Sequence, residues 1–224
     1  MKRRDFALSL SSVLAAGSLV LPTAQAQTTT PAIAQGKPPE AGTDFLPLAK
    51  PAPVDTPAGK VEVIEFFSYD CPHCNAFEPA FSAWIKKVPK DVVVKRAPVP
   101  FIGAFERRQR LYFTLESMGL LDKLHAKVFY AIHVEHQALD SDDALVNWVA
   151  KQGVDKAKFT EQFSSFTVAS KVRRATQLTG EYKVEGVPAM GVAGRFYTDG
   201  TLAKGTDRVL QVVDYLVGEV RKGR

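Results

Sequence analysis

The sequence contains only two cysteines, Cys71 and Cys74, in 224 residues. Structural zinc sites usually take four ligands, and beyond this pair the chain offers only four histidines, so a zinc centre is disfavoured. A disulfide that closes so short a loop removes little entropy from the unfolded chain, so a purely structural bridge is also disfavoured. We therefore expect no metal and no cofactor, and we assign the chemistry to the two cysteines themselves.

A large charge, internal repeats and a membrane-spanning run are lacking as well. The formal net charge is +5, and it falls to +3 when the three basic residues and one acid of positions 1–26 are removed. This excess is too small to indicate nucleic-acid binding. The basic clusters at 107–110 and 173–174 have no interleaved aromatic residues and no nucleic-acid motif, so we expect them to be solvated.

Residues 1–26 have the pattern of an export signal. Basic residues at 2–4 precede a moderately apolar stretch at 6–21, and the small residues Ala-Gln-Ala at 24–26 suit a cleavage site. The apolar stretch is too short and too interrupted to cross a bilayer. Adjacent arginines at 3 and 4 resemble a twin-arginine signal, so both the general and the twin-arginine route remain open. We expect the mature protein outside the bacterial cytoplasm, where disulfides persist.

The rest of the chain divides by composition and periodicity. Residues 27–57 are rich in proline and polar residues, which predicts a flexible or extended leader without a packed element. Beyond it, apolar periodicity and turn signals predict alternating strands and helices. Strands are expected at 61–68, 92–97, 189–197 and 201–204, with a turn at 198–200, and helices from 71 to about 88 and at 105–118, 120–136, 142–152, 155–163, 167–182 and 207–221.

The segment Cys71-Pro72-His73-Cys74 directly follows the apolar run at 61–67, which predicts a dithiol redox centre. A strand-to-helix boundary places Cys71 at a helix N-terminus, where unpaired N–H groups and the helix dipole favour the thiolate. Pro72 suits the first helical position, and His73 offers a positive charge beside Cys71. Stabilisation of the reduced form is typical of a disulfide that is readily donated.

The order of elements predicts an α/β, thioredoxin-like fold with an inserted all-helical domain. Residues 58–101 and 167–222 would form the thioredoxin-like domain, and residues 102–166 the insertion. The chain resembles the DsbA family of periplasmic thiol:disulfide oxidoreductases over nearly all of residues 58–222. The resemblance rests on the insertion length and on Glu65-Phe66-Phe67-Ser68, the Cys-x-x-Cys, Phe77-Glu78 and Gly186-Val187-Pro188-Ala189-Met190.

This resemblance implies an enzyme that donates the Cys71–Cys74 disulfide to newly exported, unfolded or partly folded proteins with free cysteines. It also implies a periplasmic location and reoxidation by a DsbB-type membrane oxidase. We expect a monomer that binds no nucleic acid. Two alternatives are a disulfide reductase or isomerase arm, which usually needs a dimerisation domain, and a redox-silent binding or chaperone domain, which the intact cysteines disfavour.

Roles for individual residues follow from position and from the resemblance. We expect Cys71 to be the nucleophile and Cys74, one turn into the helix, to be buried. Strand alternation points Glu65 inward beneath the cysteines, where a carboxylate must be protonated or paired. The alternative is a solvent-facing acid at the strand end. In the family an acid at this position handles the proton of the buried cysteine, beside a basic residue that corresponds here to Arg96, which cannot release its proton.

Val187-Pro188 resembles the cis-proline loop of thioredoxin folds, which implies that the Val187 backbone pairs with an extended substrate. The alternative is that Pro188 is an ordinary strand-edge proline. Met190 follows this loop and is a candidate to line the substrate groove, although a methionine here is more often a core residue. His133 and His136 lie one helical turn apart with no further ligand pattern, and we expect both to face solvent.

Overall fold

The computed structural model describes residues 37–223. The predicted export signal at 1–26 and the first part of the predicted leader, 27–36, lie outside these residues. The described elements are, in chain order, β1 (Leu46–Pro47), β2 (Val61–Phe67), α1 (Pro72–Ile85), β3 (Val92–Pro98), α2 (Phe105–Ser117), α3 (Leu121–His133), α4 (Asp142–Lys151), α5 (Lys156–Phe163), α6 (Phe166–Glu181), β4 (Ala189–Val192), β5 (Phe196–Asp199) and α7 (Thr206–Arg221).

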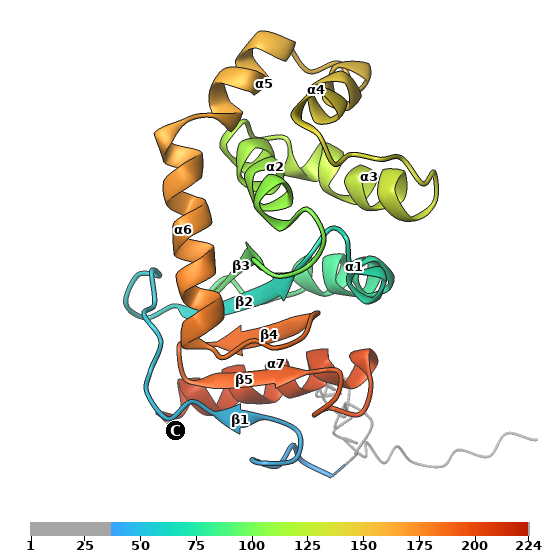
Figure 1. Ribbon diagram of the computed structural model, residues 1–224. Coiled ribbons are helices and arrows are strands. Elements are labelled where there is room, and N and C mark those ends of the chain that lie inside the picture. The colour runs from blue at the N-terminus through green and yellow to red at the C-terminus, as the bar shows by residue number, and fades with distance from the viewer. Residues whose placement is uncertain (1–36, 224) are drawn as a thin grey trace, which may run out of the picture. The chain divides into compact units, whose positions relative to one another are not determined.

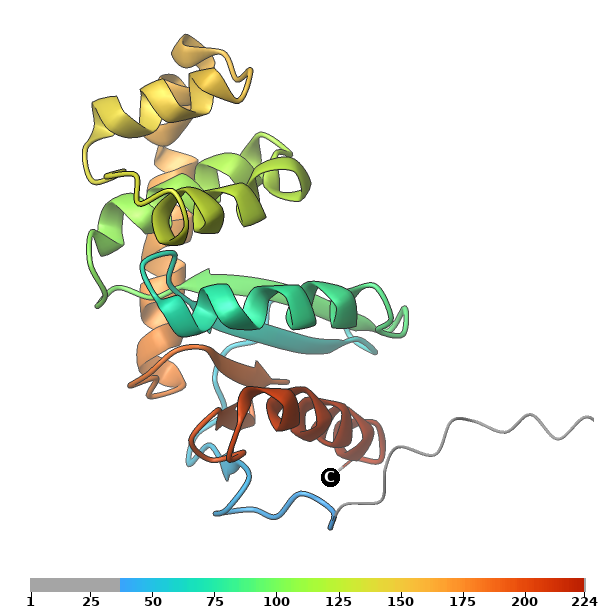
Figure 2. The same cartoon turned by 90° about the vertical axis from the view of Figure 1, so that its right-hand side faces the viewer.

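Within the described residues the strands form one mixed sheet in the order β1-β5-β4-β2-β3. The central strand β2 runs parallel to β3 and antiparallel to β4. Every residue of β2 is buried, because helices cover both faces of the sheet. Figure 2 shows α1 and α7 side by side over one face, with α6 behind the other. The buried strand β2 therefore leads directly into the loop before α1.

Helices α2 to α5 lie together beyond the β3 edge of the sheet, and α6 leads the chain back to β4 (Figure 1). This arrangement confirms the thioredoxin-like α/β fold with a helical insertion, while the domain limits at 102 and 166 stay predictions. None of the helices in residues 37–223 combines the length and the hydropathy that a bilayer crossing requires.

The prediction of an unpacked leader is wrong for the N-terminal segment, residues 37–57. Leu46 and Pro47 pair with β5 as an edge strand, and Phe45 and Ala52 are buried. An edge strand tolerates proline, because its outer side makes no ladder hydrogen bonds. The composition of this segment gave no signal of packing, since its partners lie far along the chain.

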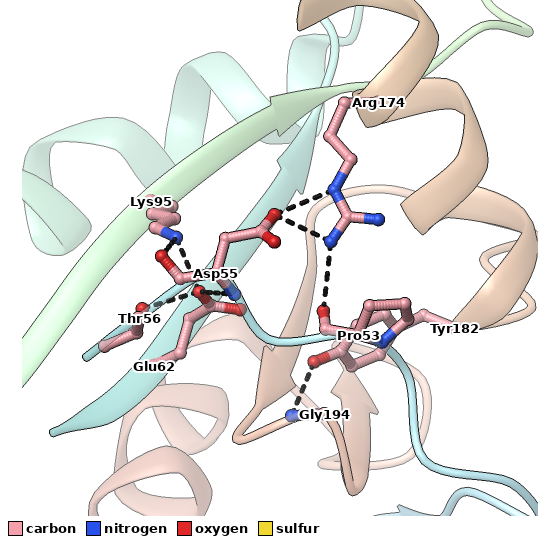
Figure 3. A network of polar contacts seen from close by, with 8 residues as sticks. All are labelled: Pro53, Asp55, Thr56, Glu62, Lys95, Arg174, Tyr182 and Gly194. Atoms are coloured by element: carbon pink, nitrogen blue, oxygen red, sulfur yellow. Dashed lines mark hydrogen bonds and ion pairs between the residues drawn. The ribbon is translucent and has the colours of Figure 1, made fainter. Parts of the chain in front are cut away.

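Polar contacts fasten the end of the N-terminal segment to the sheet and to α6 (Figure 3). The buried carboxylate of Glu62 accepts hydrogen bonds from the Asp55 backbone at 3.2 Å and from the Thr56 hydroxyl and the Lys95 ammonium at 2.6 Å. Arg174 of α6 forms an ion pair with Asp55 at 2.6 Å. These contacts hold the segment against β2 and α6.

The predicted hairpin is misplaced in the sequence. The two strands expected at 189–197 and 201–204 are instead β4 and β5, joined by a turn in which Ala193 and Gly194 have φ of 52° and 67°. Two successive residues with positive φ suit a tight hairpin. Alanine rarely adopts this conformation, so the turn was not visible in the sequence. A turn does follow at Gly200, but Asp199 is the last residue of β5.

Candidate active site

The two cysteines lie at the junction between β2 and α1. Cys71 is the N-cap of α1, and Pro72 occupies the first helical turn, where its missing N–H costs no helical bond. Cys71 is 5% exposed and Cys74 is fully buried, whereas His73 is on the surface. The motif therefore holds one sulfur at the edge of the protein and the other beneath it.

The environments of the two thiols differ strongly. A hydrogen bond from the Cys74 thiol, with smaller contributions from the backbone N–H groups of Cys74 and His73 and the charge of His73, lowers the pKa of Cys71 to about 6 against the opposing effect of burial. Burial, together with the same hydrogen bond, raises the pKa of Cys74 far above its ordinary value. At neutral pH Cys71 is mainly a thiolate and Cys74 keeps its proton.

The loop before β4 faces the cysteines. The Val187–Pro188 peptide bond is cis, and Sγ of Cys71 lies 3.4 Å from the Val187 carbonyl oxygen, to which the protonated form of Cys71 donates. A cavity of about 310 Å³ begins here, lined by His73, Gly186, Val187 and Pro188 on one side and by the β5–α7 turn on the other. The loop and His73, two residues after Cys71, thus line the same hollow.

Met190 does not border this hollow, so the prediction that it lines a substrate groove is wrong. It lies opposite Glu65 in the β2–β4 ladder and is fully buried in the core that α1 and α7 cover. Pairing of β4 with β2 begins at Ala189, so Met190 already belongs to the sheet and its side chain points inward.

Glu65 is buried beneath the motif, at 1% exposed, so the solvent-facing alternative is wrong. It lies opposite Arg96 in the β2–β3 ladder, and Nε of Arg96 donates to Oε2 of Glu65 at 2.7 Å. Burial raises the pKa of Glu65 to about 7, with Arg96 opposing the rise and Glu78 adding to it. The carboxyl group therefore exchanges its proton near neutral pH.

Arg96 also holds a second carboxylate, which sequence analysis did not assign a role. Nη2 of Arg96 donates to both oxygens of Glu78 at 2.8 Å. Glu78 stands four residues after Cys74 on α1, and residues at this spacing share a helix face. The spacing from Cys74 was thus the one sign in the sequence that Glu78 lies near the active site.

Helix α3 supplies two histidines to the loop before Cys71. Nδ1 of His125 lies 2.7 Å from the Tyr69 hydroxyl, and Nε2 of His133 lies 2.8 Å from the Tyr69 carbonyl oxygen. His125 is buried and His133 half-buried, so the prediction of a solvent-facing side chain is wrong for His133. His136 is exposed, as expected. Only the folded position of α3 brings these residues to Tyr69, and their spacing alone could not show it.

Arg108 of α2 is buried, which corrects the expectation of a solvated basic cluster at 107–110. Its Nε donates to Oδ1 of Asp70 at 2.9 Å, and its Nη1 donates to the Leu139 carbonyl. Asp70 directly precedes Cys71, so this ion pair fastens the helical insertion to the active-site loop. In residues 37–223, no cluster of three or more histidine, cysteine or acidic side chains is arranged to hold a metal ion.

Comparisons with known proteins agree with this geometry. Residues 62–217 match the family model of the DSBA-like thioredoxin domain. The chain is 42% identical over 217 residues to the thiol:disulfide interchange protein DsbA of Bordetella parapertussis, with 96% of each chain covered. It is 39% identical over 214 residues to the protein of the same name from Pseudomonas aeruginosa, again with 96% of each covered.

Solved structures show the same likeness. The crystal structure of Pseudomonas aeruginosa DsbA gives a TM-score of 0.78 at 40% sequence identity, covering 82% of this chain and 95% of that chain. The oxidoreductase DsbA of Xylella fastidiosa gives a TM-score of 0.76 at 29% identity, covering 82% of this chain and 98% of that chain.

Proposed function

This chain belongs to the family of DSBA-like thioredoxin-domain proteins and is a thiol:disulfide oxidoreductase, and from that premise we propose that it acts as an oxidase, transferring a Cys71–Cys74 disulfide to newly exported proteins in the periplasm. Its substrates are unfolded or partly folded chains that carry free cysteines. A DsbB-type membrane oxidase restores the disulfide. The predicted export signal at 1–26 supports the location.

The unequal pair of thiols carries the proposal. Cys71 is stabilised as a thiolate by hydrogen bonds from Cys74 and from the start of α1. These hydrogen bonds have no counterpart of equal strength in the disulfide, where neither sulfur is charged. Because they favour the reduced form, they drive electrons from a substrate dithiol onto the Cys71–Cys74 pair.

The reaction proceeds in two exchanges at one sulfur. A substrate thiolate attacks Sγ of Cys71, the Cys71–Cys74 bond breaks, and Cys74 leaves as a thiolate that takes up one proton, for which Glu65 is the buried donor. A second substrate thiolate then attacks the substrate sulfur of the mixed disulfide, and Cys71 leaves as a thiolate. The substrate loses two electrons, the enzyme gains them, and one of the two substrate protons is left in solution.

The cis-proline loop supplies the substrate contact. We assign the Val187 backbone, in the loop before β4, to pairing with an extended substrate segment. The cavity of about 310 Å³ bordered by His73 and Pro188 gives room for a side chain of that segment. Pro188 has no N–H to compete for the sulfurs.

Trapping of mixed disulfides tests the assignment of the nucleophile. Cys74→Ser, expressed with its export signal, should accumulate adducts with exported proteins through Cys71, visible on non-reducing gels. Cys71→Ser is the matched control and should trap almost none, because Cys74 is fully buried. Equal adducts in the two variants would show that the nucleophile is wrongly assigned.

The direction of the reaction needs its own measurement. The purified chain, equilibrated with glutathione buffers, should hold the Cys71–Cys74 pair reduced even when oxidised glutathione is in excess, and its disulfide should oxidise a reduced dicysteine peptide. A pair that stays oxidised in reducing glutathione would support a reductase and refute the oxidase proposal.

A further inference from the structure

Five side chains from five parts of the fold form a continuous buried cluster beneath the redox helix. In order of contact they are Glu65 of β2, Arg96 of β3, Glu78 of α1, His125 of α3 and Tyr69 of the loop after β2. The first three are joined by hydrogen bonds of 2.7 to 2.8 Å. Nε2 of His125 lies 3.4 Å from Oε2 of Glu78, and Nδ1 lies 2.7 Å from the Tyr69 hydroxyl. The cluster thus returns to the loop that carries Cys71.

The charges of this cluster do not balance when both acids are ionised. One guanidinium serves two carboxylates, with two hydrogen bonds to Glu78 and one to Glu65. One negative charge is left over in a site where Glu65 is 1% exposed. An uncompensated buried charge is costly, so the cluster binds a proton instead.

Two groups of the cluster carry sites that can hold that proton. Burial raises the pKa of Glu65 to about 7. The second group is His125, which is 4% exposed and whose Nε2 has no hydrogen-bond partner within residues 37–223. Burial lowers the pKa of His125, whereas Glu78 favours its charged form. Nε2 faces the carboxylate of Glu78, which binds the same guanidinium as Glu65.

We propose that His125 is a positioning residue for the thiol chemistry, which acts on Glu65 through Glu78 and Arg96 because the two groups share a single balancing proton. When His125 is protonated, it offsets Glu78, and the charge of Arg96 then stabilises an ionised Glu65. When His125 is neutral, Arg96 is divided between two carboxylates and the proton resides on Glu65.

The other groups that face this pair do not titrate in the same range. Tyr69 and Tyr112 pack against the His125 ring, and burial raises the pKa of both phenols. The remaining ionisable neighbour of Glu65 is Cys74, whose pKa burial also raises. Arg96 cannot give up its proton. No titrating group therefore stands between Glu65 and His125 in this range, and their coupling through Glu78 and Arg96 is electrostatic.

The coupling has a role in the cycle, and that role rests on the proposed oxidase function. An ionised Glu65 accepts the proton of Cys74 when the enzyme is reoxidised. A protonated Glu65 supplies the proton that Cys74 takes up when the enzyme oxidises a substrate. Because His125 shifts the balance between these two forms, it sets the pH at which ionised and protonated Glu65 are equally populated.

Titration of the reduced full-length protein tests the coupling, with the Glu65 carboxyl carbon and the His125 ring followed by NMR. In the wild type both signals should show two inflections at the same two pH values, as interacting sites do. In His125→Gln the Glu65 signal should show one inflection, moved upward by about one pH unit, since the competing site is gone. The pH profile of reoxidation should move by the same amount.

His133→Gln is the matched control, because His133 lies on the same helix and contacts Tyr69 but not the carboxylates. It should leave the Glu65 titration unchanged. The reciprocal variant, Glu65→Gln, keeps the proposal testable if His125→Gln does not fold. It should give His125 a single inflection at lower pH, because coupling between two sites acts equally in both directions.

The proposal is overturned if the His125 ring shows no change where Glu65 titrates, or if the Glu65 curve is the same in His125→Gln and the wild type. Oxidation of a reduced dicysteine peptide by the wild-type disulfide form separates this outcome from failure of the proposed function. Peptide oxidation with uncoupled titrations refutes only the role of His125. Coupled titrations without peptide oxidation refute only the oxidase.

Discussion

Glu65→Gln should stabilise the reduced protein at neutral and alkaline pH and have little effect on its stability at acid pH. In the wild type, burial raises the pKa of Glu65 from an ordinary value of 4.5 to about 7. Between these two values the folded state holds a proton that the unfolded chain has released. The free energy of unfolding therefore falls as the pH rises through this window. Glutamine, which has no proton to release, does not contribute this loss.

The magnitude follows from the same two values. Each pKa unit corresponds to about 1.4 kcal/mol, so the wild type loses about 3 kcal/mol of stability across the window that the glutamine variant keeps. Glutamine retains an oxygen that accepts the hydrogen bond from Arg96, and Arg96 stays balanced by Glu78. The free energy of unfolding of the variant, relative to that of the wild type, should thus increase by about 3 kcal/mol between acid and alkaline pH.

Urea denaturation of the reduced proteins, from below pH 4.5 to above pH 7, measures this difference. Glu62→Gln is the matched control, because Glu62 lies on the same strand and is equally buried but accepts three hydrogen bonds. The Glu62→Gln variant should have a free energy of unfolding lower by about 1–3 kcal/mol, because donors such as Lys95 lose a charged acceptor. A Glu65→Gln difference that does not change with pH, or that turns against the variant as the pH rises, would refute the reasoning.

Three further predictions concern the thiolate and its loop. The reduced protein should be more stable to urea than the disulfide form at alkaline pH. This advantage should shrink as the pH falls from about 9 to about 6, because the pKa of Cys71 is lowered from 9.0 to about 6 in the folded protein; a disulfide form of equal or greater stability above about pH 9 would contradict it. His73→Ala should raise the pKa of Cys71, measured by the ultraviolet absorbance of the thiolate, and an unchanged curve would remove His73 from the mechanism. Arg108→Met should cost about 3–5 kcal/mol in urea denaturation, because it leaves the Asp70 carboxylate unpaired. It should also raise the pKa of Cys71. Adding Asp70→Asn should reverse this rise but restore only part of the stability, because the hydrogen bond to the Leu139 carbonyl stays lost; a rise that persists in the double variant would exclude the ion pair as its cause.

The local features of the active site could be predicted from the sequence. The strand ending near residue 67, the N-terminal position of Cys71 and the early helical position of Pro72 follow from patterns of a few adjacent residues. The inward direction of Glu65 follows from strand alternation. Each of these depends on neighbours along the chain, and each is present in the structure.

Features that depend on distant contacts could not be predicted. Arg96 is shared with Glu78 because β3 and α1 pack across β2, and His133 reaches Tyr69 only through the position of α3. Met190 was misassigned because the sequence does not show where the loop ends and pairing with β2 begins. The order of elements was visible, but their mutual distances were not.

The pairing of β1 with β5 has a consequence for the order in which the protein assembles. The Thr198 hydroxyl donates to the Asp44 carbonyl across 154 residues of chain, and Leu46 pairs with Tyr197. Closing so long a loop is slow, and a chain that emerges from its N-terminus has no β5 to pair with until most of it has been delivered. The earliest part of the described chain is therefore the last to enter the sheet, and until it does so β5 presents an open edge to other unfolded chains.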